Sequence, residues 1–444
     1  MKKKMLVIGA VAAGTSAAAK ARRVDPELEI KVFADGEDIS YGACGLPYYI
    51  GGTIKTMEKL LARTIEDFAR HDIEVRNRCQ ALEIDPGERT VLLRDLVQNR
   101  NFTERYDRLV IATGARPMLL DCRNSNLPGI FTLRTVSDGV AIKEYLEKKK
   151  PANILIVGAG YIGLEMAETL SRLGLSVTLA ERQPHVAPNM DADMAAKIQE
   201  HLEQHGVRVL VDTEIVGFEG QETVQRAFTP SSSFPVDFVL VSIGVRPNTQ
   251  LAADAGIKLG VANAIKINSR METNLEGIYA AGDCATAHHR VTGKDVYIPM
   301  GTTANKQGRV AGANAAGGSE VFRGVLGTGI ARVFDLEISR TGLTEKECMP
   351  AGFDFYSHSV ECRTAAIPGL AGPIWIKLTA SRADNRLLGA QIVGRNNAAK
   401  RIDVYAAAIT MGARLEDIYD MDLAYSPPFS PVWDPVLVAL NRFR

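Results

Sequence analysis

A hydrophobic strand, a glycine-rich turn and a helix follow one another twice in this chain, and no other sequence feature constrains the fold as strongly. The first copy is KMLVIGAVAAG, followed by an alanine-rich helix and EIKVFA; the second is ANILIVGAGYIGLEMAETLSRLGLSVTLAE. Each copy is typical of a βαβ unit, from which parallel sheets with helices on their faces are built. Two such units, with turns that begin at Gly9 and Gly158, predict two dinucleotide-binding sites in one chain.

The second turn fits the GxGxxG pattern with Gly158, Gly160 and Gly163. The first glycine permits a tight turn, the second lets a pyrophosphate approach the backbone, and the third lets the helix pack on the strand. Glu181 ends the next strand, where a carboxylate binds ribose hydroxyls and repels a 2′-phosphate. NADH is therefore favoured over NADPH, although the adjacent Arg182 leaves that preference open. The alternative interpretation is a structural glycine turn without a ligand.

The first turn is less regular. Gly9 and Gly14 match the outer glycines, but Val11 stands at the middle position. The expected carboxylate position after the second strand is Ala34, with Asp35 beside it. This turn alone does not decide whether a nucleotide binds there.

Asp283 gives the first unit independent support. It follows Gly282 at the end of the hydrophobic segment TNLEGIYAAGD. A carboxylate at that place can accept hydrogen bonds from a sugar-alcohol chain such as the ribityl group of FAD. The competing interpretation is an aspartate that caps a helix.

Charge and hydropathy exclude several kinds of partner. The chain has 52 basic and 52 acidic residues and no block of like charge, so we expect no nucleic-acid partner. No apolar run of about 18 residues predicts a membrane span. The N-terminus resembles a secretory signal, but the strand–turn–helix–strand pattern runs directly through it. The six cysteines have no disulfide-framework or metal-ligand spacing, which favours a reducing, cytoplasmic compartment.

Cys44 lies alone in SYGACGLPYYIGG, with no second cysteine within thirty residues. A thiolate is the nucleophile of disulfide exchange, and Pro47 favours a helix whose N-terminus would lower the thiol pKa. Without a resolving cysteine, the second sulfur has to come from the substrate. Cys44 would then rest as a mixed disulfide, a persulfide or a sulfenic acid. The alternative is a buried apolar cysteine. Of the others, Cys284 lies nearest a predicted cofactor residue.

The sequence pattern changes from about residue 325 onward. PIWIKLTASRADNRLLGAQIVG is typical of a hairpin with RADN as its turn, and AAKRIDVYAAAITMGA of an amphipathic helix ended by Gly412. We expect a separate α+β domain here.

Several segments together resemble the two-dinucleotide-domain flavoprotein disulfide reductases along nearly the whole chain. They are VIGAVAAGTSAAAKARR, ATGARP, GAGYIGLE, IYAAGD and ANKQGRVAGANAAGG. SYGACGLPYY and AYSPPFSPVWDPV resemble one branch, the coenzyme A-disulfide reductases, persulfide/polysulfide reductases and NADH oxidases. The resemblance implies an α/β fold with two Rossmann-like dinucleotide-binding domains and a C-terminal α+β dimerisation domain. The implied domains are FAD-binding at 1–119 and 247–324, NAD(P)H-binding at 120–246, inserted between them, and dimerisation at 325–444.

The resemblance also assigns site residues. It implies that Cys44 is catalytic and that Tyr425 lies near the flavin of the other subunit in a homodimer. The positions that match the family's cofactor motifs, for FAD and for NADH or NADPH, are Gly9, Ala13, Gly14, Asp35, Ser40, Thr113, Gly114, Arg116, Gly158, Gly160, Tyr161, Ile162, Gly163, Glu165, Glu181, Gly244, Gly282, Asp283, Thr303 and Ala304.

The first glycine loop and its helix bear on the substrate. Relatives that reduce oxygen or peroxide resemble this chain but carry a histidine where it has Ala12, which favours a sulfur substrate here. Ser16, Lys20 and Arg23 match positions that contact coenzyme A in the coenzyme A-disulfide reductases. Cations there would pair with its phosphates; a solvated basic face is the alternative.

Other positions depart from the coenzyme A group and suggest a differently shaped thiol pocket. Ala43 replaces an asparagine, Ala366 and Ile367 replace tyrosines, Asn305 replaces a histidine, and Trp433 replaces a lysine. The substrate-binding residues expected from the resemblance are Ser16, Lys20, Arg23, Ser40, Asn305 and Trp433.

The leading hypothesis is an FAD-dependent NAD(P)H:disulfide oxidoreductase that reduces coenzyme A disulfide, a persulfide or a polysulfide through Cys44. One alternative is an NADH oxidase or peroxidase that cycles Cys44 through a sulfenic acid; another is a redox-sensing, NADH-binding flavoprotein. His201 and His205 in HLEQH have the i, i+4 spacing of a metal-binding pair, but the sequence supplies no third ligand and no HExxH glutamate. We therefore expect no metal site.

Overall fold

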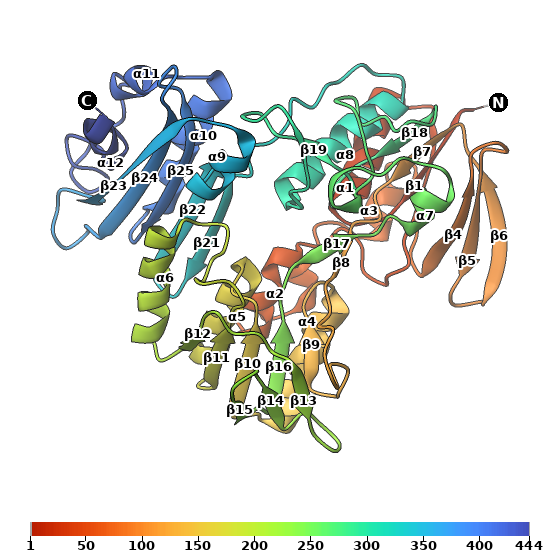
Figure 1. Cartoon of the computed structure of the whole chain (residues 1–444). Helices are drawn as coiled ribbons and strands as arrows, with labels where there is room; N and C mark the ends of the chain where they lie inside the picture. Colours follow the sequence, from red (N-terminus) through yellow and green to blue (C-terminus); the bar gives the residue numbers. More distant parts are fainter. Residues whose placement is uncertain (1, 444) are drawn as a thin grey trace.

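The structure is a computed structural model that describes residues 2–443. Figure 1 shows three parts: two α/β parts, each built on a parallel sheet, and a C-terminal part built on an antiparallel sheet. The strand β18 (Ile278–Ala280) returns to the first sheet after the second sheet is complete. The predicted fold class, with one nucleotide-type domain inserted in the other, is confirmed. In the described part of the chain, no helix has both the length and the apolar character that a membrane crossing needs.

The first parallel sheet has the strand order β18-β7-β1-β2-β3. Its central strand is β1 (Lys4–Ile8), in which Met5, Leu6 and Val7 are fully buried. The segment that resembles a secretory signal therefore forms the middle of a core. The other strands are β2 (Glu29–Phe33), β3 (Ile73–Arg76) and β7 (Arg108–Ile111), and a separate antiparallel sheet contains β4 (Cys79–Asp85), β5 (Thr90–Asp95) and β6 (Arg100–Arg105).

Helices α1 (Ala12–Val24) and α8 (Gly301–Ala315) pack with their backbones in close contact. A Cβ atom added to Gly308 would lie 2.3 Å from the carbonyl oxygen of Ala13, and one added to Gly312 would lie 2.0 Å from that of Ala17. The two helices therefore run in the same direction and require small residues along their contact. This explains the alanine and glycine richness of both segments.

The second parallel sheet has the order β12-β11-β10-β16-β9. Its strands are β9 (Ile130–Thr132), β10 (Asn153–Val157), β11 (Ser176–Ala180), β12 (Arg208–Leu210) and β16 (Phe238–Val241). Its helices are α4 (Val136–Lys149), α5 (Tyr161–Arg172) and α6 (Ala192–Gln204), and a small antiparallel sheet contains β13 (Gly217–Glu219), β14 (Arg226–Phe228) and β15 (Ser233–Pro235). The βαβ unit predicted around GAGYIG is β10, α5 and β11.

Two short strands carry the chain between the parallel sheets. They are β8 (Ala115–Pro117) and β17 (Val245–Pro247), which pair antiparallel. Next to them, Thr113 Oγ1 donates to the Asn248 carbonyl at 2.6 Å, and Asn248 Nδ2 donates back to the Thr113 carbonyl at 3.0 Å. The reciprocal bonds tie the two crossings together.

The C-terminal sheet has the order β21-β22-β25-β24-β23. The predicted hairpin is β24 (Pro373–Ser381) with β25 (Leu387–Gly394), and the predicted helix is α10 (Ile402–Met411), ended by Gly412 at φ +71°. The other elements are β21 (Gly329–Val333), β22 (Leu336–Gly342), β23 (Phe355–Arg363), α9 (Glu345–Ala351), α11 (Leu415–Tyr419) and α12 (Pro435–Val438).

A buried lysine joins α6 to the C-terminal sheet. Lys377 on β24 is 5% exposed, and its Nζ lies 3.3 Å from Asp191, 2.8 Å from Asp193 and 3.1 Å from Glu345. Gln391 on β25 also donates to the Asp191 carboxylate at 2.6 Å. A buried ammonium group needs such partners, so this cluster fixes the second α/β part against the C-terminal part.

Candidate active site

Cys44 lies in a single 3₁₀ turn, Ala43–Gly45, directly before helix α2 (Leu46–Ile50). Pro47 stands in the first turn of α2, as the sequence predicts. Cys44 is exposed, and among the described residues it is the only exposed cysteine. The residue is therefore within reach of a substrate, although neighbouring groups partly surround its sulfur.

Helix α2 comes from the first α/β part but packs on the second. It contacts α4 and α5, and Figure 1 shows it between the two parallel sheets. A Cβ atom on Gly139 of α4 would lie 2.9 Å from Leu46 Cδ2, and Thr169 Oγ1 of α5 donates to the Pro47 carbonyl at 3.5 Å. The inserted part thus holds the turn that carries the thiol.

Charges from three other segments act on Cys44. Burial is the largest influence and raises the pKa of the thiol; the carboxylates of Glu165 and Asp283 raise it further, and Arg134 opposes them. The net pKa is raised, so the predicted lowering is wrong for this structure. Helix α2 has only five residues, and the field at its N-terminus does not outweigh the loss of solvent around the sulfur.

Glu165, on the inward side of α5, titrates near neutrality. Burial raises the pKa of its carboxyl to about 7, and the neighbouring carboxylate of Glu168 adds to the effect. A group with such a pKa next to a reactive thiol can hold or release a proton at physiological pH.

The first glycine turn has the shape that an FAD pyrophosphate requires. Gly9 has φ +108°, and a Cβ atom there would lie 2.1 Å from the carbonyl oxygen of Ala112. A Cβ atom on Gly14 would lie 1.8 Å from the carbonyl oxygen of Gly9. No side chain caps the N-terminus of α1, so its first N–H groups remain available to a phosphate. Val11, at the N-cap, does not prevent this geometry.

Two residues that the sequence did not identify fix Asp283 and the backbone on either side of it. Arg134 Nη2 lies 2.6 Å from the Asp283 carboxylate. Gln307 on α8 is fully buried; it accepts from the Gly282 N–H at 2.9 Å and donates to the Thr286 carbonyl at 2.9 Å. A lone glutamine among the small residues of ANKQGRVAGANAAGG was a visible signal, whereas nothing in the sequence marked Arg134.

Several other predicted FAD positions lie around the same turns. A Cβ atom on Gly114 would lie 3.9 Å from Arg134 Nη2, and one on Gly282 would lie 3.4 Å from Ala304 Cβ. Ser40 is buried with φ +48°, and its N–H donates to the Ala10 carbonyl at 2.8 Å. The remaining positions are the exposed Asp35 directly after β2, Ala13 at the start of α1, Arg116 on β8 beside Asn248, Gly244 before β17, and Thr303 in the first turn of α8.

The second glycine turn fits a nicotinamide dinucleotide in the same way. Gly158 has φ +102°, and a Cβ atom on Gly163 would lie 2.0 Å from the Gly158 carbonyl oxygen. At Gly160 nothing lies within 4 Å of an added Cβ atom, which leaves room for a pyrophosphate. Helix α5 begins after it with Tyr161 and Ile162 and has no side-chain cap.

Glu181 is fixed by two backbone donors. Its carboxylate accepts from the N–H of Ala159 at 2.8 Å and from the N–H of Gln183 at 2.8 Å, and the residue is 8% exposed. The carboxylate therefore faces the glycine turn, where a nicotinamide dinucleotide would place its ribose.

A groove beside α1 contains most of the predicted substrate residues; we call it the α1 groove. It is a cavity of about 460 Å³ lined by Ser16, Arg23, Ser40 and Asn305. Its other lining residues are Val11, Ala12, Thr15, Ala19, Tyr41, Gly42, Ala62, Arg63, Phe68 and Arg309. Ser16 Oγ donates to Asn305 Oδ1 at 2.7 Å. The groove lies near the turn Ala43–Gly45, because Gly42, two residues before Cys44, is one of its lining residues.

Lys20 and Trp433 lie elsewhere. Lys20 is outside the lining of the groove and pairs with Glu320 at 2.6 Å. Trp433 and Tyr425 are about half exposed, 49% and 50%, in the segment between α11 and α12. Neither residue is among the lining residues of the α1 groove.

The family of the chain follows from comparison with known proteins. Residues 3–314 match the pyridine nucleotide-disulphide oxidoreductases, and residues 330–435 match the dimerisation domain of these proteins. The chain therefore belongs to the pyridine nucleotide-disulphide oxidoreductase family, the FAD- and NAD(P)H-dependent flavoprotein disulfide reductases.

Individual similar proteins indicate which branch of this family the chain resembles. The chain is 40% identical over 441 residues to the NAD(P)H sulfur oxidoreductase (CoA-dependent) of Pyrococcus furiosus, with 98% of each chain covered. It is 36% identical over 438 residues to an NADH oxidase of Methanocaldococcus jannaschii, covering 98% of this chain and 97% of that one. The solved structure of an NAD-dependent persulfide reductase from A. fulgidus matches 99% of this chain and 83% of that one, with 38% identity and a TM-score of 0.96. The resemblance stated from the motifs is confirmed.

Proposed function

We propose that this protein reduces coenzyme A disulfide, a persulfide or a polysulfide with electrons from NADH or NADPH, using Cys44 as its only redox thiol. The observation that carries the proposal is the exposed thiol of Cys44 at the junction of the two α/β parts. The relatives named for sulfur and persulfide reduction support it. Bound FAD would supply the two-electron path from the nicotinamide cofactor to sulfur.

The chemistry at Cys44 needs one bond exchange. The thiolate attacks a disulfide R–S–S–R, a bond forms between Cys44 Sγ and one sulfur, the S–S bond of the substrate breaks, and R–S⁻ leaves and takes up a proton. Two electrons and a proton then convert the mixed disulfide to R–SH and the Cys44 thiolate. Glu165, with its pKa raised to about 7, can donate or accept that proton, and its protonation favours the thiolate.

The α1 groove is suited to an anionic thiol carrier. Its lining includes Arg23, Arg63 and Arg309, and in the described part of the chain none of the three forms a salt bridge. Unpaired guanidinium groups bind phosphate strongly. Arg23 and its neighbours would hold the phosphates of coenzyme A and direct its sulfur toward Cys44.

We also propose a cytoplasmic homodimer. The dimerisation domain supports a dimer, and so do several exposed apolar side chains of the C-terminal part: Ile367, Leu370, Phe429, Val432 and Trp433. Ala366 lies in the same region, because its N–H donates to the Pro427 carbonyl at 3.1 Å. The six unpaired cysteines favour a reducing compartment.

Replacement of Cys44 tests the proposal. Cys44→Ser should abolish NADH oxidation with coenzyme A disulfide and with polysulfide, while flavin content and reduction of the flavin by NADH stay unchanged. Cys122→Ser, at a partly buried cysteine of the second α/β part, is the matched control and should keep full activity. Undiminished turnover of both sulfur substrates by Cys44→Ser would refute the proposal.

The NADH oxidase of M. jannaschii supports a second candidate, reduction of oxygen. Ala12 lines the α1 groove, and no histidine is among the lining residues to donate a proton to a sulfenate. Oxidation of NADH by oxygen that exceeds the rate with every sulfur substrate, and that forms water, would favour this candidate.

A further inference from the structure

Three potential metal ligands meet where α6 contacts the C-terminal sheet. His201 lies in the last turn of α6 and His205 directly follows the helix. Asp335 lies in the tight turn between β21 and β22. One ligand atom from each residue lies within 4.8 Å of the other two. The histidine pair therefore has a potential third ligand that the sequence did not reveal, because Asp335 comes from a segment 130 residues further along the chain.

His201 Nε2 faces a carboxylate oxygen at a distance that would also suit two ligands of one metal ion. This nitrogen lies 3.0 Å from Asp335 Oδ1, yet it is buried without a correctly oriented hydrogen-bond partner. His201 is 3% exposed, so water does not compensate for the missing bond. Neighbouring nitrogen and oxygen ligands on zinc, each about 2.1 Å from the ion, are separated by about 3.0 to 3.4 Å.

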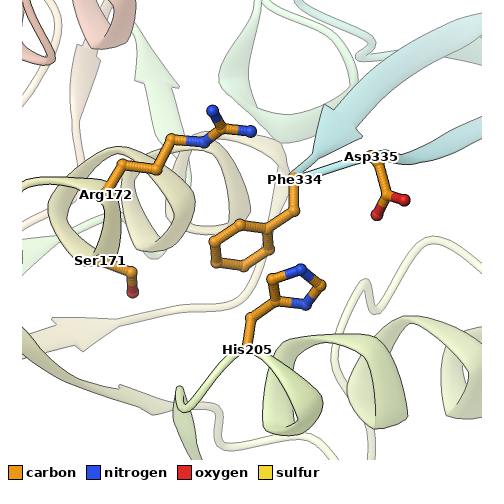
Figure 2. Close-up of a pocket in the computed structure, with 5 residues that line it drawn as sticks. All are labelled: Ser171, Arg172, His205, Phe334 and Asp335. Carbon is orange, nitrogen blue, oxygen red and sulfur yellow. The ribbon is translucent and has the colours of Figure 1, made fainter.

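His205 is oriented so that its second nitrogen is available. Its Nδ1 lies 2.9 Å from the carbonyl oxygen of His201, where it donates, and this leaves a lone pair on Nε2. The ring stacks on Phe334 with a centroid distance of 4.0 Å and an interplanar angle of 14°. Figure 2 shows the two rings against each other, with Asp335 beside them.

The surroundings allow an ion to enter. An open cavity of about 320 Å³ is lined by His205, Phe334 and Asp335 together with Ser171 and Arg172. The C-terminal end of α6 carries a partial negative charge that favours a cation. The positive charge of Arg172 is already compensated by Glu168 at 2.8 Å.

In this structure the guanidinium group of Arg395 supplies the positive charge beside His201 and Asp335. Its Nη2 donates to His201 Nδ1 at 3.1 Å, and its Nη1 lies 3.4 Å from Asp335 Oδ2. A neutral imidazole that binds a metal through Nε2 carries its hydrogen on Nδ1, so the guanidinium group has to withdraw. Its side chain is 35% exposed and can turn toward solvent. Arg395 therefore competes with a metal ion for this site.

We propose that His201, His205 and Asp335 bind a divalent transition-metal ion of the zinc class and so join α6 to the C-terminal sheet. Two imidazoles and one carboxylate are ligands that zinc prefers, and the open cavity leaves a fourth position for water. The site is independent of the sulfur chemistry at Cys44, so this proposal and the proposed function are tested separately.

Direct measurement of bound zinc tests the site. The flavin-loaded protein, free of any affinity tag and carrying Cys44→Ser so that no exposed thiol binds zinc, is dialysed against zinc chloride, and zinc per chain is measured. We expect one zinc per chain. Loss of even a supporting residue of a metal site costs roughly 10- to 100-fold in affinity, so His205→Gln and Asp335→Asn should each weaken binding by roughly tenfold or more. His201 is left unchanged because it is buried.

Two further variants make the test specific. His71→Gln removes an exposed histidine elsewhere and should leave zinc binding unchanged, whereas Arg395→Gln removes the competing cation and should tighten it. Zinc should also raise the melting temperature of the parent protein but not that of Asp335→Asn. Absence of stoichiometric zinc in the parent, or equal affinity in the parent and Asp335→Asn, would overturn the proposal.

Discussion

Replacement of Glu165 by glutamine should change both the stability of the protein and the reactivity of its thiol. The carboxyl has a pKa of about 7 in the folded chain against an ordinary value of 4.5. This difference corresponds to about 3 kcal/mol at most. Because the folded chain binds this proton more tightly than the unfolded chain, stability falls as pH rises from 4.5 to about 7 and changes no further above that. Glu165→Gln has no titrating carboxyl at this position, so its stability does not fall in this way.

Chemical unfolding at pH 5 and pH 8 would measure the effect in the flavin-loaded protein. The variant should gain stability relative to the parent at pH 8, by up to about 3 kcal/mol, and should gain much less at pH 5. Glu222→Gln, at an exposed position of the same α/β part, is the matched control and should behave as the parent at both values. The rate of alkylation of reduced Cys44 by iodoacetamide, followed against pH, is the second measurement. Its midpoint should move to lower pH in Glu165→Gln, because the Glu165 carboxylate raises the pKa of the thiol.

Two results would refute this reasoning. If the parent and Glu165→Gln lose stability equally between pH 5 and pH 8, the Glu165 carboxyl does not titrate in that interval. If the alkylation midpoint is the same in both proteins, the carboxylate does not act on Cys44. Each conclusion stands without the other, so the burial of Glu165 and its influence on the thiol are tested separately.

Two further substitutions test the nucleotide sites. Gln307→Leu leaves the Gly282 N–H and the Thr286 carbonyl without their buried partner and should destabilise the protein by about 2 to 4 kcal/mol, with reduced flavin content; a flavin-loaded variant as stable to urea as the parent would contradict this. Gly163→Ala places a Cβ atom 2.0 Å from the Gly158 carbonyl oxygen and should raise the KM for NADH without loss of flavin; an unchanged KM would show that the second glycine turn does not position the nicotinamide cofactor.

The sequence predicted those features that depend on neighbouring residues. The βαβ units, the hairpin with the RADN turn and the helix ended by Gly412 are all encoded by local periodicity and by glycine positions. Gly9 has φ +108° and Gly158 has φ +102°, backbone conformations that favour glycine. The glycine pattern therefore marked both turns in the sequence.

Features that depend on distant segments escaped prediction. Arg134 reaches Asp283 across 149 residues, and Asn248 bonds to Thr113 across 135. No periodic pattern links such positions. The pKa of Cys44 was predicted in the wrong direction for the same reason, because the sequence showed the short helix after the thiol but not the burial or the carboxylate of Glu165.

The arrangement of the cysteines explains why one thiol has to take its second sulfur from outside the chain. Cys79, the nearest in sequence, is 4% exposed, and burial raises the pKa of its thiol to about 11. Cys284, beside Asp283, is fully buried and donates to the carbonyl oxygens of Ile111 and Ala281. Cys348 is fully buried, and its pKa is raised to about 12. These three thiols are not accessible, so none of the three can resolve a disulfide on Cys44. Cys122 and Cys362 are partly buried, whereas Cys44 is exposed. A substrate that brings its own sulfur, as a disulfide, persulfide or polysulfide does, is what the exposed thiol beside the α1 groove requires.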